Sequence, residues 1–234
     1  MSLCHPELGS VSCGSCCGLF NLKLTIPEFK KILQDRTELF RSTVNFQVRH
    51  SFPIYRKERE TVEANYPKED EMTYNCPFLG YVDENNNRIG CMIHPVFTGD
   101  PKSQNFSFYG TSICQTYDCK NKESILTEKW ESLFVEIAKD SVQYSFLSAD
   151  HIFCYVIERF FALHSLTMDV MFSKYRTELI SVFLARLEKT ENLHLTSFEI
   201  NYDSFGGLEE VVSYLKKELG DVYFSLEGLG KPNH

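Results

Sequence analysis

Cys13-Gly14-Ser15-Cys16-Cys17-Gly18 is the stretch around which the rest of the chain is predicted to be organised. Three thiols fall within five residues, a density that a soft metal ion needs and a packed core does not. Thiolates are strong ligands for zinc and iron, and the spacing of Cys13 and Cys16 lets two sulfurs from one turn reach one metal. Gly14 and Gly18 permit the backbone angles that a tight chelating turn requires. The stretch therefore indicates a metal-binding protein.

Most of the remaining cysteines also fall in local pairs. Cys76 and Cys91 flank a predicted hairpin, and Cys114 and Cys119 are separated by four residues. Eight of the nine cysteines lie at or before position 119. Cys154 lies in an aromatic helical pattern and is predicted to be an ordinary core residue. The predicted metal ligands are Cys4, Cys13, Cys16, Cys17, Cys76, Cys91, Cys114 and Cys119.

The spacing leaves the cofactor open between zinc and an iron–sulfur cluster. Zinc takes four ligands in a tetrahedron, so seven or eight cysteines could form one site with spare thiols, or two sites. A [4Fe-4S] cluster also takes four thiolates. Zinc would favour a structural site that supports an interaction module. A cluster would favour an enzyme or enzyme component for redox chemistry or group transfer. Disulfides are a third alternative, disfavoured by the odd cysteine count and the missing signal peptide.

The order of these motifs resembles the CxxCxxCC-type family of zinc- or iron-chelating domains. Two features depart from the family pattern. Ser10 stands where the family has its first cysteine, and Cys4 is the candidate to replace that ligand. His94 follows the Cys91 motif where the family has Tyr and Arg-Pro. The resemblance implies metal chelation and, in some members, a part in protein methylation. The matching segments, within roughly residues 10–120, are Cys13 to Cys17, Cys76-Pro77-Phe78-Leu79, Gly90-Cys91-Met92-Ile93, and the pair Cys114 and Cys119.

Charge and hydropathy narrow the function classes. The formal net charge of −8 argues against a general nucleic-acid or anionic-membrane binder, which usually carries a basic face. The first residues, Met1 to Pro6, lack the basic start and apolar run of a secretory signal. No run approaches the roughly 18 apolar residues of a membrane span. We therefore expect a cytoplasmic protein that binds neither nucleic acid nor membrane.

Charge and cysteines both change character near residue 120. Residues 1–120 carry 13 basic and 14 acidic residues, net −1, whereas residues 121–234 carry 11 and 18, net −7. We predict an α+β protein with an irregular cysteine-rich metal-binding domain over 1–120 and a mainly helical, acidic domain over 121–234. The helical half could bind a protein partner, although a solvated surface is the ordinary reason for its charge.

Periodicity predicts the elements of each half. In the first, Ile26, Phe29, Leu33 and Phe40 share one helical face. A strand is expected over 44–56, a solvated loop or strand edge over 56–71, and irregular chain over 1–21 and 96–113. Strands over 76–82 and 88–95, joined by an Asn-rich turn, predict a hairpin. In the second half, apolar stripes over 130–138, 152–161, 171–187 and 208–219 predict a helical bundle, with a strand over 193–202.

Overall fold

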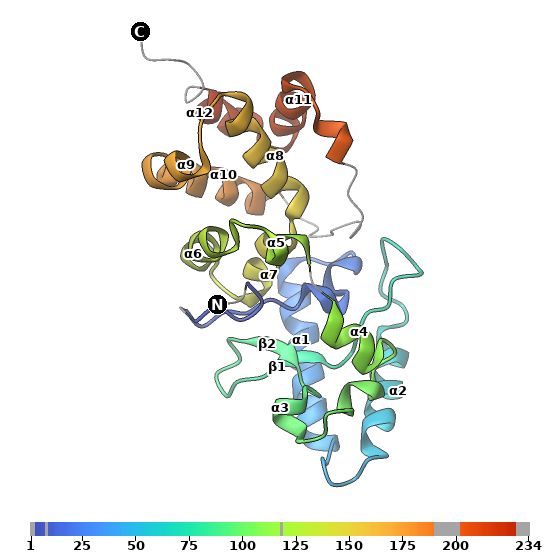
Figure 1. The fold of residues 1–234 in the computed structure, drawn as a ribbon. Helices are drawn as coiled ribbons and strands as arrows, with labels where there is room; N and C mark the ends of the chain where they lie inside the picture. Colours follow the sequence, from blue (N-terminus) through green and yellow to red (C-terminus); the bar gives the residue numbers. More distant parts are fainter. Residues whose placement is uncertain (1–2, 8, 118, 190–201, 228–234) are drawn as a thin grey trace.

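The computed structural model describes residues 3–7, 9–117, 119–189 and 202–227. The described chain is mostly helical and contains one two-stranded antiparallel sheet, which agrees with the α+β prediction at that coarse level. Helices α8 to α12 gather at one end, and helices α1 to α4 lie with the hairpin at the other (Figure 1). The N-terminal segment, α5, α6 and α7 lie between them (Figure 1).

The elements have the following bounds. The helices of the first part of the chain are α1 (Ile26–Thr43), α2 (Ser51–Glu63), α3 (Pro95–Thr98), α4 (Gly110–Thr116) and α5 (Lys120–Glu123). Those of the second part are α6 (Thr127–Ile137), α7 (Ser141–Ala149), α8 (His151–Leu163), α9 (Met168–Lys174), α10 (Arg176–Lys189), α11 (Leu208–Leu219) and α12 (Tyr223–Glu227). The strands are β1 (Leu79–Tyr81) and β2 (Ile89–Cys91), and the 3-10 turns are η1 (Ser15–Cys17), η2 (Leu19–Asn21), η3 (Ser103–Phe106), η4 (Tyr202–Phe205) and η5 (Gly220–Val222).

Helix α1 confirms the helix predicted from Ile26. Its start is fixed by a capping box, in which the Glu28 carboxylate accepts a hydrogen bond from the backbone N–H of Thr25 at 2.7 Å. Pro27 fits the first turn, where its missing N–H is not needed. Phe29 and Leu33 are fully buried on the face that the periodicity predicted. Helix α1 thus presents one apolar face to the core.

The strand predicted over 44–56 is wrong, because residues 44–50 form turns without regular structure and residues 51–56 begin α2. The Ser51 hydroxyl stabilises the preceding turn by accepting a hydrogen bond from the backbone N–H of Asn45 at 3.1 Å. Tyr55, Arg59 and Glu63 then recur every four residues on one buried helical face. The solvated character expected for 56–71 is therefore also wrong at Arg59 and Glu63, whose charges are buried beside each other.

The predicted hairpin is confirmed. Leu79 pairs with Cys91 and Tyr81 with Ile89 in an antiparallel register. The turn is closed by Asp83, whose carboxylate accepts from the backbone N–H groups of Asn87 and Arg88 at 2.9 and 2.8 Å. The irregular chain expected over 96–113 is wrong in part, since it contains most of α3, all of η3 and the start of α4.

The predicted apolar stripes of the second half form helices. Trp130 and Phe134 on α6 meet Phe183 of α10 with ring centroids 5.4 and 5.2 Å apart. The stripe over 171–187 is divided between α9 and α10, with the break at Tyr175. The strand expected over 193–202 lies outside the described residues except at Tyr202, where η4 begins.

One hydrophobic cluster includes residues from both sides of position 120. Phe20 of η2 packs edge-to-face against Phe29 of α1 and Phe146 of α7, at centroid distances of 5.5 and 5.8 Å. A smaller cluster lies between α1, α2 and the hairpin, with Phe40, Tyr55 and Phe78 at its centre. The domain boundary near 120 stays a prediction.

Within the described ranges, none of the helices combines the length and apolar character needed to cross a bilayer.

Candidate metal centre

Helix α7 holds the N-terminal cysteine loop through two serines one helical turn apart. The Ser141 hydroxyl accepts from the backbone N–H of Ser12 at 3.0 Å, and the Ser145 hydroxyl accepts from that of Gly14 at 2.9 Å. The Ser15 hydroxyl donates to the Ser145 carbonyl at 2.8 Å. These groups are buried, so the bonds also satisfy backbone donors that would otherwise lie away from water. The loop that carries Cys13, Cys16 and Cys17 is therefore fixed against a helix.

Gly18 lets this loop pass directly against the segment before Cys76. Its φ of +78° is left-handed, and a Cβ placed there would lie 2.3 Å from the Tyr74 carbonyl oxygen. The Asn75 side chain donates to the Gly18 carbonyl. The neighbouring residues are also bonded, since the backbone N–H of Cys76, which follows Asn75, donates to the carbonyl of Cys17, which precedes Gly18, at 2.9 Å. This close approach brings together cysteines far apart in the sequence.

The thiols of Cys16, Cys17 and Cys76 come close enough at this crossing to shift each other's pKa, and we call them the thiol chain, in which Cys17 interacts with both of the others. Interaction with the Cys17 thiol lowers the pKa of Cys16, and a separate interaction with Cys17 lowers the pKa of Cys76 to about 7. The pKa of Cys17 is raised by its bonds to both neighbours and by burial. The Ser107 hydroxyl, which lies 3.3 Å from the Cys76 Sγ, lowers the pKa of Cys76 further. The two outer sulfurs are therefore the easier ones to ionise, and the thiolate is the form that binds metal.

Four of the other five predicted ligands lie within electrostatic reach of Cys16 or Cys76, and the fifth, Cys4, lies within reach of Cys13. Burial and the charge of Cys76 raise the pKa of Cys91 to about 12 and that of Cys114 to about 11. Burial chiefly raises the pKa of Cys119, and the charge of Cys16 adds to this effect. The remaining two are Cys4 and Cys13, joined by a 2.9 Å hydrogen bond from the Cys13 N–H to the Cys4 carbonyl. Burial and the charges of Cys4 and Cys16 raise the pKa of Cys13.

The donor chemistry fits a thiophilic metal ion or cluster. All nine cysteines lie in the described part of the chain, and none is in a disulfide. Across the described ranges, no three cysteine, histidine or carboxylate side chains converge closely enough to hold a metal as they stand. The structure thus brings several of these thiols within electrostatic reach of one another but does not arrange any three of them in a coordination geometry. Cys154 is buried in α8, where the Asn121 amide lies 3.5 Å from its sulfur, as expected for a core residue.

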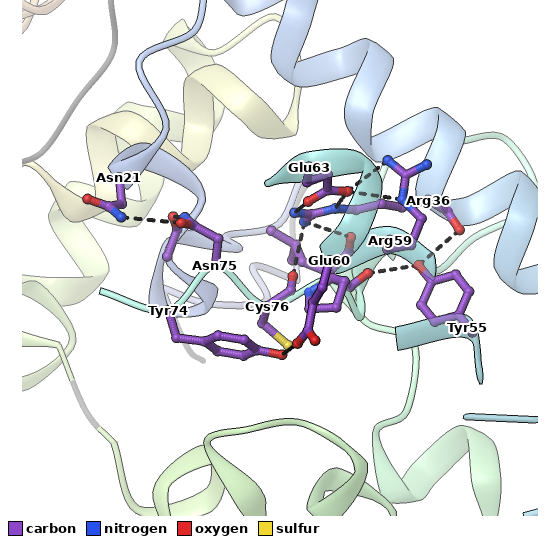
Figure 2. Close-up of polar contacts among 12 residues, drawn as sticks. Asn21, Arg36, Tyr55, Arg59, Glu60, Glu63, Tyr74, Asn75 and Cys76 are labelled. Carbon is purple, nitrogen blue, oxygen red and sulfur yellow. Dashed lines mark hydrogen bonds and ion pairs between the residues drawn. The ribbon is translucent and has the colours of Figure 1, made fainter. Parts of the chain in front are cut away.

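Behind Cys76 lies a buried group of three charges (Figure 2). Glu63 accepts from Arg36 Nε at 2.8 Å and from Arg59 Nη2 at 2.7 Å. Arg36 Nη2 also donates to Glu63, and Arg36 Nη1 donates to the Cys76 carbonyl at 3.0 Å. Tyr55 completes this support by donating to the carbonyls of Pro77 and Arg36. The backbone around Cys76 is therefore positioned by side chains from both α1 and α2.

Tyr74 and Tyr109 connect the same region to α4. The Tyr74 hydroxyl donates to the Glu60 carboxylate at 2.8 Å (Figure 2), and the Tyr109 hydroxyl donates to the Tyr74 carbonyl at 2.7 Å. Tyr109 directly precedes α4, so this bond anchors the start of the helix that carries Cys114. On the other side, Asn21 donates to Asn75 at 3.2 Å (Figure 2).

The sequence predicted which thiols are candidate ligands but not the residues that support their segments. Ser141 and Ser145 carried one available signal, because they are spaced by four residues behind Asp140, a strong helix N-cap residue. Arg36 and Glu63 carried a weaker sequence signal, which is that each falls on the apolar face of its helix. The charged composition of 56–71 concealed that signal.

A surface hollow on α6 and α9 lies among non-cysteine side chains. It measures about 440 Å³ and is lined by Lys129, Ser132, Phe172 and Arg176 among others. The Arg176 guanidinium is engaged by the Glu136 carboxylate at 2.6 Å, and Lys129 pairs with Asp169. We therefore centre the functional interpretation on the thiols.

Comparison with known proteins gives no relative for this chain: no family model, curated protein or solved structure matches it. The resemblance to CxxCxxCC-type chelating domains accordingly stays a prediction. What can be inferred about function comes from the chemistry of the thiols and the contacts that support them.

Proposed function

We propose that this protein binds zinc or an iron–sulfur cluster through its clustered cysteines, and that the bound group stabilises the packing of the N-terminal loop, the hairpin and α4. The observation that carries the proposal is the crossing at which the Cys76 backbone N–H donates to the Cys17 carbonyl at 2.9 Å, which brings Cys16, Cys17 and Cys76 together. These residues come from two segments about 60 positions apart, and other predicted ligands lie around them. A packed core gains little from thiols held this close, whereas a thiophilic metal needs them.

The electrostatics of the site also favour a bound cation. Several thiolates in one neighbourhood repel each other, which is why the charge of Cys76 raises the pKa of both Cys91 and Cys114. A metal ion removes that repulsion because each ligand then faces a positive charge. Such sites form together with the fold, so binding energy becomes folding energy. The ligands proposed are Cys4, Cys13, Cys16, Cys17, Cys76, Cys91, Cys114 and Cys119.

We also place the protein in a reducing compartment such as the cytoplasm. Thiols kept as ligands must escape oxidation to disulfides, and reducing compartments provide that condition. None of the nine cysteines, all within the described residues, is in a disulfide, in keeping with this proposal.

The test is metal content after purification without oxygen. The full chain is assayed for zinc, iron and acid-labile sulfide, and its visible spectrum is recorded. Bound zinc without colour supports a structural role. Iron with sulfide and visible absorption also supports the proposal and directs it towards the redox or group-transfer functions, including methylation, that the sequence left open. Protein without either metal, which also fails to take up zinc or ferrous iron with sulfide, would sink the proposal.

A matched pair of variants separates the site from general cysteine loss. Cys76→Ser removes a sulfur from the thiol chain, whereas Cys154→Ala removes one from the core of α8. Metal content should fall in Cys76→Ser and persist in Cys154→Ala, with far-ultraviolet circular dichroism confirming that each variant is folded. Removing the metal with a chelator should also lower the melting temperature of the wild-type protein, since the metal stabilises only the native state to which it binds.

A further inference from the structure

Cys76 is buried against a segment that lies at the surface. Its side chain is 4% exposed, and the Ser107 hydroxyl lies 3.3 Å from its sulfur. Two residues further on, Tyr109 packs against the small hydrophobic cluster that contains Cys76. The Tyr109 hydroxyl donates to the Tyr74 carbonyl at 2.7 Å, and the two rings meet edge to face with centroids 5.1 Å apart. We call residues 107–117, which include α4, the cover segment.

The elements on either side of the cover segment are fixed to the body of the protein. Before it, Phe106 of η3 stacks on Phe52 of α2 with ring centroids 4.4 Å apart. After it, the Asn121 side chain of α5 donates to the Ser148 carbonyl of α7 at 2.9 Å. Any movement of the cover segment is therefore confined to the chain between η3 and α5.

The cover segment itself is weakly packed. Residues 108–117 are all described, and none of them is buried. The apolar side chains of Phe108 and Ile113 are 69% and 51% exposed. Helix α4 is attached to η3 by a bond between side-chain amides, from Gln115 to Gln104 at 3.2 Å. Segments with few buried apolar contacts open locally at a lower free energy than the whole protein unfolds.

We infer that residues 107–117 open as a unit while the rest of the protein stays folded, and that this opening controls access to Cys76. The hydrogen bond from Tyr109 to the Tyr74 carbonyl holds the segment closed. A metal ion or a thiol reagent in solution reaches the buried Cys76 sulfur through the opening. The inference goes beyond the proposed function, because it concerns access to one thiol and applies with or without a bound metal.

Hydrogen exchange on the full chain, as purified, tests the opening. Tyr109→Phe removes the bond to the Tyr74 carbonyl but keeps the aromatic ring. The amides of α4, and that of Tyr117, which donates to the Ile113 carbonyl at 3.0 Å, should exchange about 2- to 12-fold faster, the range for one neutral hydrogen bond. The amides of α1 should exchange at the wild-type rate. Tyr175→Phe is the matched control, since it makes the same change at a partly buried position after α9, and it should leave α4 unaffected.

Alkylation reports on the thiol itself. The protein is treated with a chelator and a phosphine reductant and labelled with N-ethylmaleimide, and the labelled cysteines are identified by peptide mass spectrometry. In Tyr109→Phe, Cys76 should react faster by the same factor as the α4 amides. Cys154, which is buried in α8, should react at its wild-type rate. Hydrogen exchange does not require removal of metal, so it decides the question if the chelated protein does not stay folded.

Three results would overturn the inference. One is exchange of the α4 amides at the same rate in Tyr109→Phe and the wild type. Another is an equal acceleration of the α1 amides or of Cys154, since that reports unfolding of the whole protein. The third is faster exchange in α4 with unchanged alkylation of Cys76, because the opening would then not control access to this thiol.

Discussion

Glu63→Gln is the substitution whose effect follows most directly from the structure. The carboxylate lies between two guanidinium groups, and the exposed fractions of the side chains are 8% for Glu63, 1% for Arg36 and 8% for Arg59. Glutamine has nearly the same shape but no charge, so it leaves two buried cations without a counter-ion. Its amide group also presents N–H donors to other donors. The change therefore removes compensation without opening a cavity.

The expected cost is about 3–5 kcal/mol, the range for breaking a buried ion pair by removing one partner. For a chain of this length that corresponds to a fall in melting temperature of roughly 6–20 °C, at about 2–4 °C per kcal/mol. Urea unfolding can be followed by circular dichroism and by the fluorescence of Trp130, which is the single tryptophan and is fully buried. The two signals should move together.

Glu58→Gln is the matched control, since it makes the same chemical change at an exposed position of the same helix. Surface substitutions of this kind usually change stability by less than about 0.5 kcal/mol. If Glu63→Gln and Glu58→Gln lower the free energy of unfolding by the same amount, the argument for a buried charge group that supports the Cys76 segment is refuted.

The remaining predictions concern pH, the loop crossing and α7. Burial alone would raise the pKa of Glu63, but its two arginine partners outweigh burial and lower this pKa. The ionised carboxylate therefore stabilises the fold fully above the ordinary carboxyl pKa of about 4.3. This stabilisation is lost as the pH falls through the lower pKa of the folded state. Urea unfolding from pH 7 to 3 should thus show the gap between wild type and Glu63→Gln narrowing below about pH 4; a constant gap contradicts this. Gly18→Ala should lower the free energy of unfolding more than Gly99→Ala, since both glycines have positive φ but only at Gly18 would a Cβ lie against the Tyr74 carbonyl. Backbone strain alone costs about 1–3 kcal/mol. Equal losses of stability in urea unfolding would rule out the close approach at Gly18. Asp140→Ala should cost about 1 kcal/mol because it removes the cap of α7, whereas Asp140→Asn should be nearly neutral; thermal melts that rank them otherwise contradict the capping role.

The elements predicted well are those whose signal is local. Helix α1 has its cap and apolar face within 18 residues, and the hairpin has its turn chemistry between its strands. Helix α2 was missed because Val44, Phe46 and Val48 alternate as a strand does, while the features that make the following segment helical are distant. Arg59 and Glu63 become core residues only when Arg36 of α1 is present.

The candidate site shows the same division between local and distant information. Clustered cysteines are visible in the sequence because metal ligands come in short spacings. Their supports are not, since Ser145 is 131 residues from Gly14 and nothing near either residue indicates the other. Candidate metal-binding atoms can be recognised in the sequence, but the serines and tyrosines that position them can be recognised only once the fold is known.

The long separation between the cysteine loop and α7 has a consequence for protein synthesis. Ser12 and Ser141 are 129 residues apart, so the loop leaves the ribosome well before the helix that holds it has been made. At about 5–20 residues per second, the delay is roughly 6–26 seconds. During that interval the nascent chain displays its first thiols without the α7 contacts that later fix them. The chemical surroundings of synthesis therefore act on these thiols before the fold can protect the loop.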